Sequence, residues 1–407
     1  MGLAVVLAVA CVVLALTAAP SFGAGLLVSG WYVFGGFLPE GRATLITIAA
    51  VGYATAVALA RRRRRASRGT GAMRAYAACF AFPIAVYVRT FAADDSFYSP
   101  AQNIAGFVLL GLLISAHADT KTAAAFSGGF VAGAVVYATG ELWRVAQGGA
   151  LHTAFAAFQQ NPNFAAQILA VAVVLALLLV RVGVLGRPAG AAIVAYLGLG
   201  LLVLASAGPL LGLGAGVLYW FALWGRPTDN AQLARRVVFV ALTVAAVLAS
   251  AQTMWGVRGD DAADGSLGPR AELWSNALTR IRQQPWMGAG TDLIYTAARN
   301  GLYRPTWYSH NLFLEAWELY GFLVLATLVW VVTRVFLQNG GPGRAIVVCL
   351  VVAFSLSGTF GASYNLWVGF GVAFVATALE EGVRPGARGE AKAAAGRARS
   401  RRSLPAG

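Results

Sequence analysis

The segment Tyr308–Gly321 places polar side chains at the start of a hydrophobic run. His310 and Asn311 precede the apolar residues, and Glu315 and Glu318 lie within them. A neutral imidazole titrates in the range that suits a general base. Asn311, Glu315 and Glu318 are spaced i, i+4, i+7 and therefore share one helical face. Charged groups within a membrane span are costly and usually face a protein interior or a wet cavity. The pattern predicts a site on this face; the alternative is that these residues mark the end of a helix.

The preceding stretch, residues 253–309, is rich in arginine. Its six arginines are Arg258, Arg270, Arg280, Arg282, Arg299 and Arg304. A guanidinium group can bind phosphate oxygens through two parallel hydrogen bonds, so these side chains are candidate anion ligands. The alternative is that most of them are simply solvated. Trp307 and Tyr308 are suited to stacking on sugar rings or to a membrane interface.

A helix and a tight turn are predicted within that stretch. From Pro269 to Gln284 the apolar residues recur on one helical face: Leu273, Trp274, Ala277, Leu278 and Ile281. Proline suits the first helical turn, and Pro285 ends the helix. An amphipathic helix with a tryptophan on its apolar face is predicted to lie at the membrane surface. Residues 285–290, Pro-Trp-Met-Gly-Ala-Gly, then predict a glycine turn.

The rest of the chain has the composition of a membrane protein. Of 407 residues, 58% are hydrophobic and 12% are charged, whereas about a quarter of a soluble domain is charged. We predict an all-α polytopic membrane protein with about 12 transmembrane helices. Residues 1–383 form one integral membrane domain, and residues 384–407 form a disordered, basic cytoplasmic tail. The predicted spans are 3–19, 44–60, 73–92, 102–118, 122–140, 163–181, 188–205, 209–224, 237–252, 311–337, 345–359 and 364–380.

The short, glycine-rich segment 24–38 leaves three alternatives open: a re-entrant piece, an interfacial piece or a thirteenth span.

The net charge of +15 is concentrated beside the predicted spans. Arg61–Arg65 directly follow an apolar run, and arginines in such positions stay in the cytoplasm. No folded basic domain accompanies them, so nucleic acid is not a predicted partner. With Arg61–Arg65 inside, both termini are cytoplasmic and residues 141–162 and 253–309 lie outside. The other basic residues that fall inside include Lys121, Arg181, Arg187 and Arg344.

The order of these elements resembles the O-antigen ligase and O-antigen polymerase superfamily of bacterial envelope proteins. The shared pattern is an external loop with an arginine and a helix, a Pro-x-x-Gly-x-Gly turn, and a His-Asn pair followed by a glycine eleven positions after the histidine. The residues that match are Arg270, Pro285, Gly288, Gly290, His310, Asn311 and Gly321. Asn161-Pro162-Asn163 is also similar to the family's entry into a middle helix. The resemblance is strong across 255–325 and fair across 160–225.

The resemblance implies a glycosyltransferase C-like membrane fold and glycan transfer from an undecaprenyl-pyrophosphate carrier. The acceptor would be a lipid, a glycan or a protein, on the outer face of the bacterial inner membrane. It implies no nucleotide sugar and, in ligases, no metal, so no cofactor is predicted. His310 and Arg270 would be catalytic. The predicted substrate-binding residues are Asn311, Glu315, Glu318, Arg280, Arg282, Arg304, Trp307 and Tyr308.

One position departs from the family pattern. Ligases usually carry a second arginine after a serine at the outer end of a middle helix, and here Ala207 follows Ser206. Arg144 or Arg304 could substitute, the donor could differ, or the chain could be an inactive relative. Two other classes stay open, a lipid-linked glycan transporter and a non-catalytic scaffold. A transporter tends to show repeated halves, and no repeat is evident in the sequence.

Overall fold

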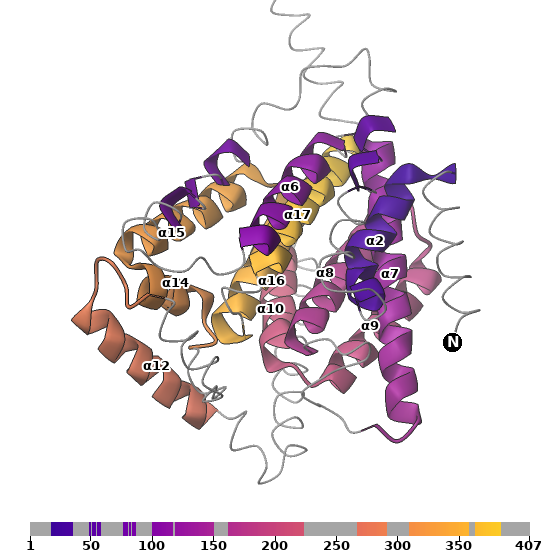
Figure 1. Cartoon of the computed structure of the whole chain (residues 1–407). Coiled ribbons are helices and arrows are strands. Elements are labelled where there is room, and N and C mark those ends of the chain that lie inside the picture. The colour runs from indigo at the N-terminus through magenta and orange to yellow at the C-terminus, as the bar shows by residue number, and fades with distance from the viewer. Residues whose placement is uncertain are drawn as a thin grey trace, which may run out of the picture.

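The computed structural model describes residues 18–35, most of 49–57 and 76–86, 100–116, 119–149, 162–223, 267–290, 309–357 and 363–383. Within these ranges the regular secondary structure is entirely helical, as predicted (Figure 1). The elements are α2 (Pro20–Gly35), α6 (Pro100–Ala116), α7 (Thr120–Ala146), α8 (Pro162–Arg181), α9 (Arg187–Leu204), α10 (Ala207–Leu218), the π-helix η2 (Tyr219–Leu223), α12 (Leu267–Gln283), α14 (Leu312–Tyr320), α15 (Phe322–Gln338), α16 (Gly341–Ser357) and α17 (Ser363–Val383).

Four helices of the described part are long and apolar enough to cross a membrane. They are Thr120–Ala146, Pro162–Arg181, Arg187–Leu204 and Asn365–Val383. Shorter apolar helices accompany them, among them α15, most of α16, and α10 together with the start of η2. The architecture is consistent with a polytopic membrane protein. The predicted total of about 12 spans stays a prediction, because 237–252 and nearly all of 3–19 lie outside the described residues.

Several predicted spans coincide with helices to within a few residues. The spans 163–181, 188–205 and 364–380 correspond to α8, α9 and α17. Helix α7 differs, because it continues to Ala146 and so makes the start of the predicted external segment 141–162 helical. No glycine or proline interrupts the chain between residues 141 and 147, so the helix has no local reason to end sooner.

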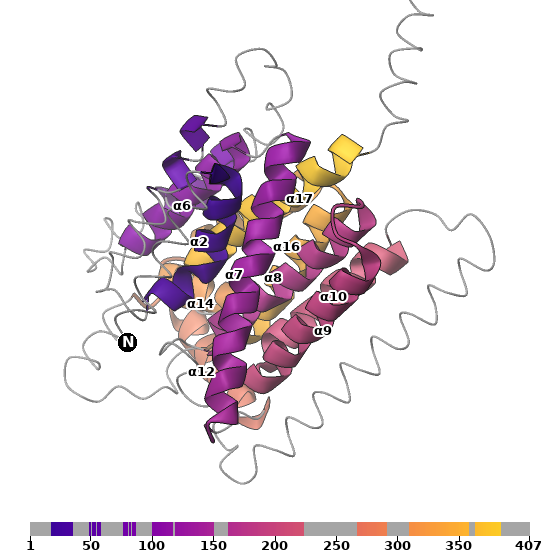
Figure 2. The ribbon, with the colours of Figure 1, turned by 90° about the vertical axis from the view of Figure 1, so that its right-hand side faces the viewer.

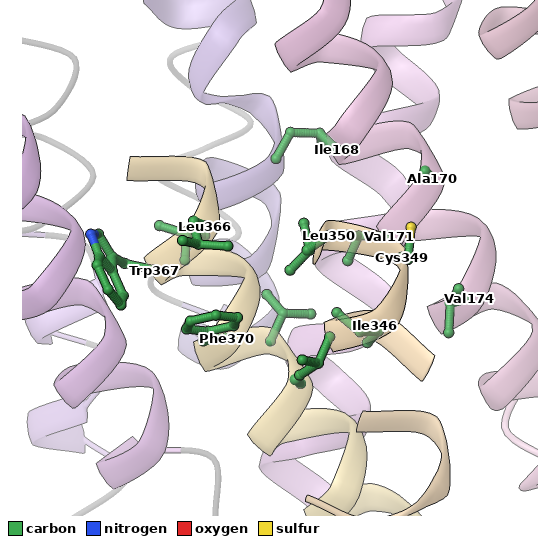
Figure 3. Close-up of a cluster of buried hydrophobic side chains, with 14 of the residues drawn as sticks. Ile168, Ala170, Val171, Val174, Ile346, Cys349, Leu350, Leu366, Trp367 and Phe370 are labelled. Carbon is green, nitrogen blue, oxygen red and sulfur yellow. The ribbon is translucent and has the colours of Figure 1, made fainter. Parts of the chain in front are cut away.

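Helix α8 lies at the centre of the bundle and packs against α7, α9, α10, α16 and α17. Its residues are apolar around almost the whole circumference and most are buried, which is the pattern of a fully enclosed helix. In Figure 3, Val171 of α8 lies near Leu350 of α16, and Trp367 and Phe370 of α17 belong to the same buried cluster. Figure 2 shows α7 running along the bundle beside α9, against which it packs.

Helix α2 (residues 20–35) includes most of the glycine-rich segment 24–38, for which three alternatives were open. It packs closely on α7. Small residues permit this approach. A Cβ on Gly25 would collide with the carbonyl oxygen of Phe126, and one on Gly129 with that of Phe22. Gly25 of α2 and Gly129 of α7 therefore serve the packing of these two helices.

The basic residues predicted to share one side of the membrane gather at one end of the bundle. Arg181 lies 3.6 Å from Glu380. Arg344 donates from Nε to the carbonyl oxygens of Phe336 and Asn339, and so caps the end of α15. Thr377, one turn before Glu380, bonds the backbone N–H of Gly340 at 3.0 Å. This end lies opposite α12 and α14 (Figure 1).

Candidate functional site

The His-Asn pair lies at the start of α14, at the end of the bundle away from the basic residues. Asn311 is the N-cap, and its Oδ1 accepts hydrogen bonds from the backbone N–H groups of Phe313 and Leu314 at 3.0 and 3.1 Å. His310, just before the cap, has φ 48°, in the left-handed region. Such a conformation is uncommon for a residue with a Cβ, and strained backbone of this kind clusters at functional sites.

The two carboxylates that follow are buried. Glu315 is 2% exposed and Glu318 is 4% exposed. Glu315 lies in the first turn of α14, where the helix dipole favours a negative charge. Both acids therefore face protein, in agreement with the predicted inward face.

The predicted single span 311–337 is wrong, because the helix breaks at Gly321. This residue has φ 83° and separates α14 from α15. A Cβ there would collide with the carbonyl oxygen of Trp286. The close approach of the 285–290 turn therefore requires glycine and a change in chain direction.

The turn and the end of α14 are joined by backbone hydrogen bonds. The N–H groups of Ala289 and Gly290 donate to the carbonyl oxygens of Glu318 and Leu319 at 2.7 and 3.1 Å. Phe322 N–H donates to Pro285 O at 3.0 Å. Trp317 Nε1 donates to the same carbonyl oxygen at 3.0 Å. Gly288 and Gly290 both have positive φ, as the glycine turn predicted.

Helix α12 begins and ends close to the predicted limits, with Pro269 in its first turn and Pro285 beyond its end. The prediction that its apolar face lies on the membrane surface is wrong. Leu273, Ala277 and Ile281 are at most 9% exposed. Helix α14 packs against α12. Because α14 lies beside α12, the apolar face is buried in protein, although Leu278 is 40% exposed.

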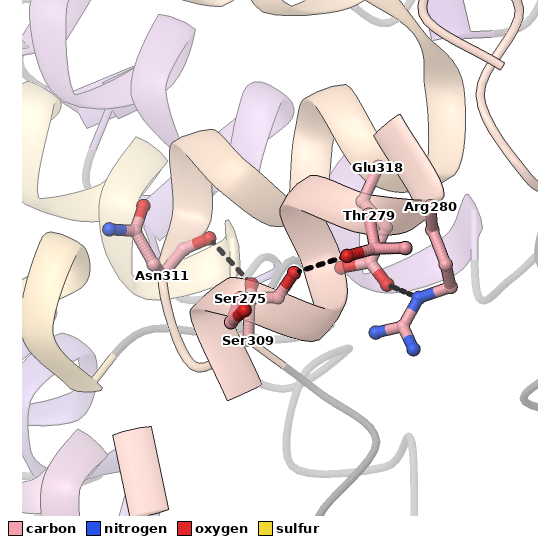
Figure 4. Close-up of polar contacts among 6 residues, drawn as sticks. All are labelled: Ser275, Thr279, Arg280, Ser309, Asn311 and Glu318. Carbon is pink, nitrogen blue, oxygen red and sulfur yellow. Dashed lines mark hydrogen bonds and ion pairs between the residues drawn. The ribbon is translucent and has the colours of Figure 1, made fainter. Parts of the chain in front are cut away.

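A side-chain ion pair crosses this contact. Arg280 Nε donates to Glu318 Oε1 (Figure 4). The arginine side chain is 33% exposed and the Glu318 side chain 5%. The guanidinium group therefore compensates the negative charge of a buried carboxylate. Arg282, two positions further along α12, is exposed and forms no ion pair with the other described residues. Arg280 therefore has a protein partner, whereas Arg282 is accessible to an anion.

A second contact joins α12 to the start of α14, and the sequence did not predict it. Trp274 Nε1 donates to the carbonyl oxygen of Ser309 at 2.9 Å. Ser309 is fully buried and immediately precedes His310. Its Oγ also donates to the carbonyl oxygen of Asn311 at 3.3 Å (Figure 4). The spacing of Arg270 and Trp274 was visible in the sequence. The hydrogen-bond partner of Trp274 was not, because Ser309 lies 35 residues further along the chain.

Ala207, which stands where ligases usually carry a second arginine, is the first residue of α10. Ser206 before it is fully buried and donates from Oγ to Asn163 Oδ1 at 2.5 Å. Nearby on α8, Gln167 Oε1 accepts from Asn365 Nδ2 at 3.3 Å, and Gln167 Nε2 has no hydrogen-bond partner among the residues that the structure describes. The Asn163 side chain thus joins the start of α8 to the break between α9 and α10.

Arg144, one candidate to replace the missing arginine, is held by its own helix. Its Nε donates to Glu141 Oε1 at 3.0 Å, and Glu141 is fully buried. Arg304, Trp307, Tyr308 and Asn161 lie outside the described residues, as does the side chain of Arg270, whose backbone belongs to α12. Across the ranges that are described, no three His, Cys, Asp or Glu side chains are grouped to hold a metal.

One segment of the chain, which contains the elements of this site, matches a known protein family. Residues 191–329, about a third of the chain, match the family described as O-antigen ligase. The match runs from α9 into α15 and includes α12, the glycine turn and α14. No curated protein sequence matches the chain. The family match confirms the resemblance inferred from the motif order.

Proposed function

Because residues 191–329 relate the chain to the O-antigen ligase and polymerase superfamily, we propose that it is a membrane glycosyltransferase. It moves a glycan from an undecaprenyl-pyrophosphate carrier to a lipid, glycan or protein acceptor. The reaction takes place on the outer face of the bacterial inner membrane, with both chain termini in the cytoplasm. Residues 253–309 are on the outer side in this proposal.

The observation that carries the proposal is the contact between α12 and α14. It joins the helix that contains Arg270 to the backbone that presents His310. These are the two residues that the chemistry needs most, a cation for a departing pyrophosphate and a base for an attacking hydroxyl. Both lie in the segment that matches the family.

The proposed reaction is a single displacement at the anomeric carbon. The acceptor hydroxyl forms a bond to that carbon as the bond to the pyrophosphate oxygen breaks. The hydroxyl proton passes to His310, and the undecaprenyl pyrophosphate leaves as an anion stabilised by Arg270. The products are the glycosylated acceptor and the free carrier.

Exposed Arg282 is available to assist at the pyrophosphate, since a second cation would compensate in part for Ala207. Arg280 instead holds Glu318. In this proposal Asn311 shapes the start of α14, and Glu315 and Glu318 line the protein side of the site without direct chemistry.

The test is turnover by the purified full-length protein reconstituted in lipid vesicles. The donor is a defined undecaprenyl-pyrophosphate-linked oligosaccharide. Lipid A-core, a second lipid-linked oligosaccharide and an acceptor protein are supplied in turn, and products are identified by mass spectrometry. Transfer to any of the three supports the proposal and identifies the acceptor class. If donor crosses vesicle bilayers without transfer, the chain is a transporter; if neither occurs, the chain is a scaffold.

A further inference from the structure

Trp274 lies between the two residues assigned to the chemistry. It follows Arg270 by four positions in α12, so the two share a helical face about 6 Å apart along the axis. Its indole N–H reaches the carbonyl oxygen of Ser309 at 2.9 Å. The next residue in the chain is His310.

The backbone at this point needs an external restraint. His310 has φ 48° although it carries a Cβ, and such a conformation persists only where the surroundings hold it. On its C-terminal side the Asn311 cap supplies hydrogen bonds. On its N-terminal side, the Trp274 bond to Ser309 is a restraint supplied by a distant part of the chain.

We propose that Trp274 is a positioning residue that holds His310 at a set distance from Arg270. The inference rests on the proposed function for its effect on turnover. The indole does not touch the reacting atoms; it ties the carbonyl oxygen before His310 to the helix that contains Arg270. The ion pair between Arg280 and Glu318, farther along the same contact, fixes the helices but does not reach the His310 backbone.

The decisive substitutions replace the indole N–H alone. 3-Benzothienylalanine at position 274 keeps the ring shape and lacks the N–H donor, whereas 5-fluorotryptophan keeps both. Trp274→Phe is the genetically simple variant, and Trp143→Phe is its control because Trp143 is 67% exposed. The analogue pair keeps the test valid if Trp274→Phe does not fold.

The first readout is independent of activity. The chain has three histidines, His117, His152 and His310, so a full-length His117→Gln/His152→Gln protein with ¹³C-labelled histidine gives one imidazole signal. We expect benzothienylalanine to shift or broaden this signal, and fluorotryptophan and Trp143→Phe to leave it unchanged. An unchanged signal with benzothienylalanine would overturn the inference.

The second readout is turnover with the undecaprenyl-pyrophosphate-linked oligosaccharide. Loss of one positioning hydrogen bond is expected to lower kcat by about 5- to 100-fold, with donor KM and thermal stability close to wild type. An equal loss with fluorotryptophan, or a loss confined to KM, would also overturn it. If wild type transfers nothing, the proposed function fails, and the imidazole signal still decides whether Trp274 positions His310.

Discussion

At the scale of single residues, His310 combines an uncommon backbone conformation with a position just outside a capped helix. The cap is Asn311, whose side-chain oxygen is engaged by two backbone N–H groups. The side chain that caps α14 is therefore that of Asn311 and not the imidazole of His310.

His310→Ala is expected to lower transfer by about 10²- to 10⁴-fold, the usual contribution of base catalysis. Donor binding should survive, because the pyrophosphate is held by arginine in the proposed mechanism. Turnover and donor binding are measured on the same preparations. Asn311→Ala should reduce turnover less and lower stability by about 1 kcal/mol through loss of the cap. Normal turnover by His310→Ala would exclude it as the base, and loss of donor binding would move it to the pyrophosphate site.

Arg270→Ala is expected to abolish transfer, and Arg270→Lys to leave partial activity, with protein levels unchanged. Lysine keeps the charge and loses the bidentate geometry that guanidinium offers to phosphate. Initial rates with the lipid-linked donor, normalised to folded protein, distinguish these outcomes. Arg282→Ala is the companion variant. Full activity of Arg270→Ala with loss in Arg282→Ala would reassign the pyrophosphate contact.

At the scale of elements, α12, the glycine turn and α14 form one interlocked unit. Backbone bonds join the turn to the end of α14, an ion pair crosses the helix contact, and an indole N–H reaches the start of α14. The apolar face of α12 is buried in this contact. The unit therefore positions the candidate site by protein contacts and does not depend on lipid to orient α12.

Within the ion pair, Arg280→Ala is expected to destabilise the protein more than Glu318→Gln does. Removing the arginine leaves a buried carboxylate without its partner, whereas the arginine side chain is one-third exposed and can be hydrated when the carboxylate is removed. We expect roughly 1–3 kcal/mol for Arg280→Ala, reduced from the fully buried case by that exposure. Thermal unfolding in detergent measures both variants. Exposed Arg282→Ala is the matched control, and an equal loss there would contradict the argument.

Gly321→Ala is expected to destabilise the unit, because alanine meets both a positive φ and the carbonyl oxygen of Trp286. Strain of this kind costs about 1–3 kcal/mol. Gly198→Ala in α9 is the control, because a Cβ there meets nothing within 4 Å. The same thermal unfolding measurement compares the two. Equal stability of both variants would mean that the turn can withdraw from α14 at no cost.

At the scale of the whole molecule, the bundle separates a basic end from the end that contains the candidate site. Lys121 belongs to the basic end as well, because Gly382 of α17 approaches Thr120 at the start of α7. Arg181 and Arg344 lie with Glu380 and Thr377 as described. The grouping of these basic residues follows the positive-inside pattern, and the identity of the two sides is a prediction.

Reporter fusions test that orientation. A fusion near Gly265 should appear on the outer face, and fusions near Arg65 and after Arg384 should appear in the cytoplasm. Alkaline phosphatase and a cytoplasmically fluorescent protein, fused at each position, report opposite sides. A cytoplasmic signal from Gly265 would remove the proposed active site, because the proposed reaction takes place on the outer face.

The sequence by itself determined the helical class, most helix limits in the described ranges, the stop at Pro285 and the glycine turn. These follow from local composition, from apolar periodicity and from the special backbone of proline and glycine. It also anticipated that Glu318 faces protein and that basic residues collect at one end. The family resemblance came from motif order, and the match over residues 191–329 confirms it.

Only the tertiary structure decided which surfaces meet. The apolar face of α12 fits a membrane surface or another helix equally well, and the neighbouring α14 settles the matter. The break at Gly321 depends on a carbonyl oxygen 35 residues earlier in the chain, at Trp286. The partners of Trp274 and Arg280 lie 35 and 38 residues away. Periodicity reports the environment of a face but not the identity of its partner, so these contacts could not be predicted from local pattern.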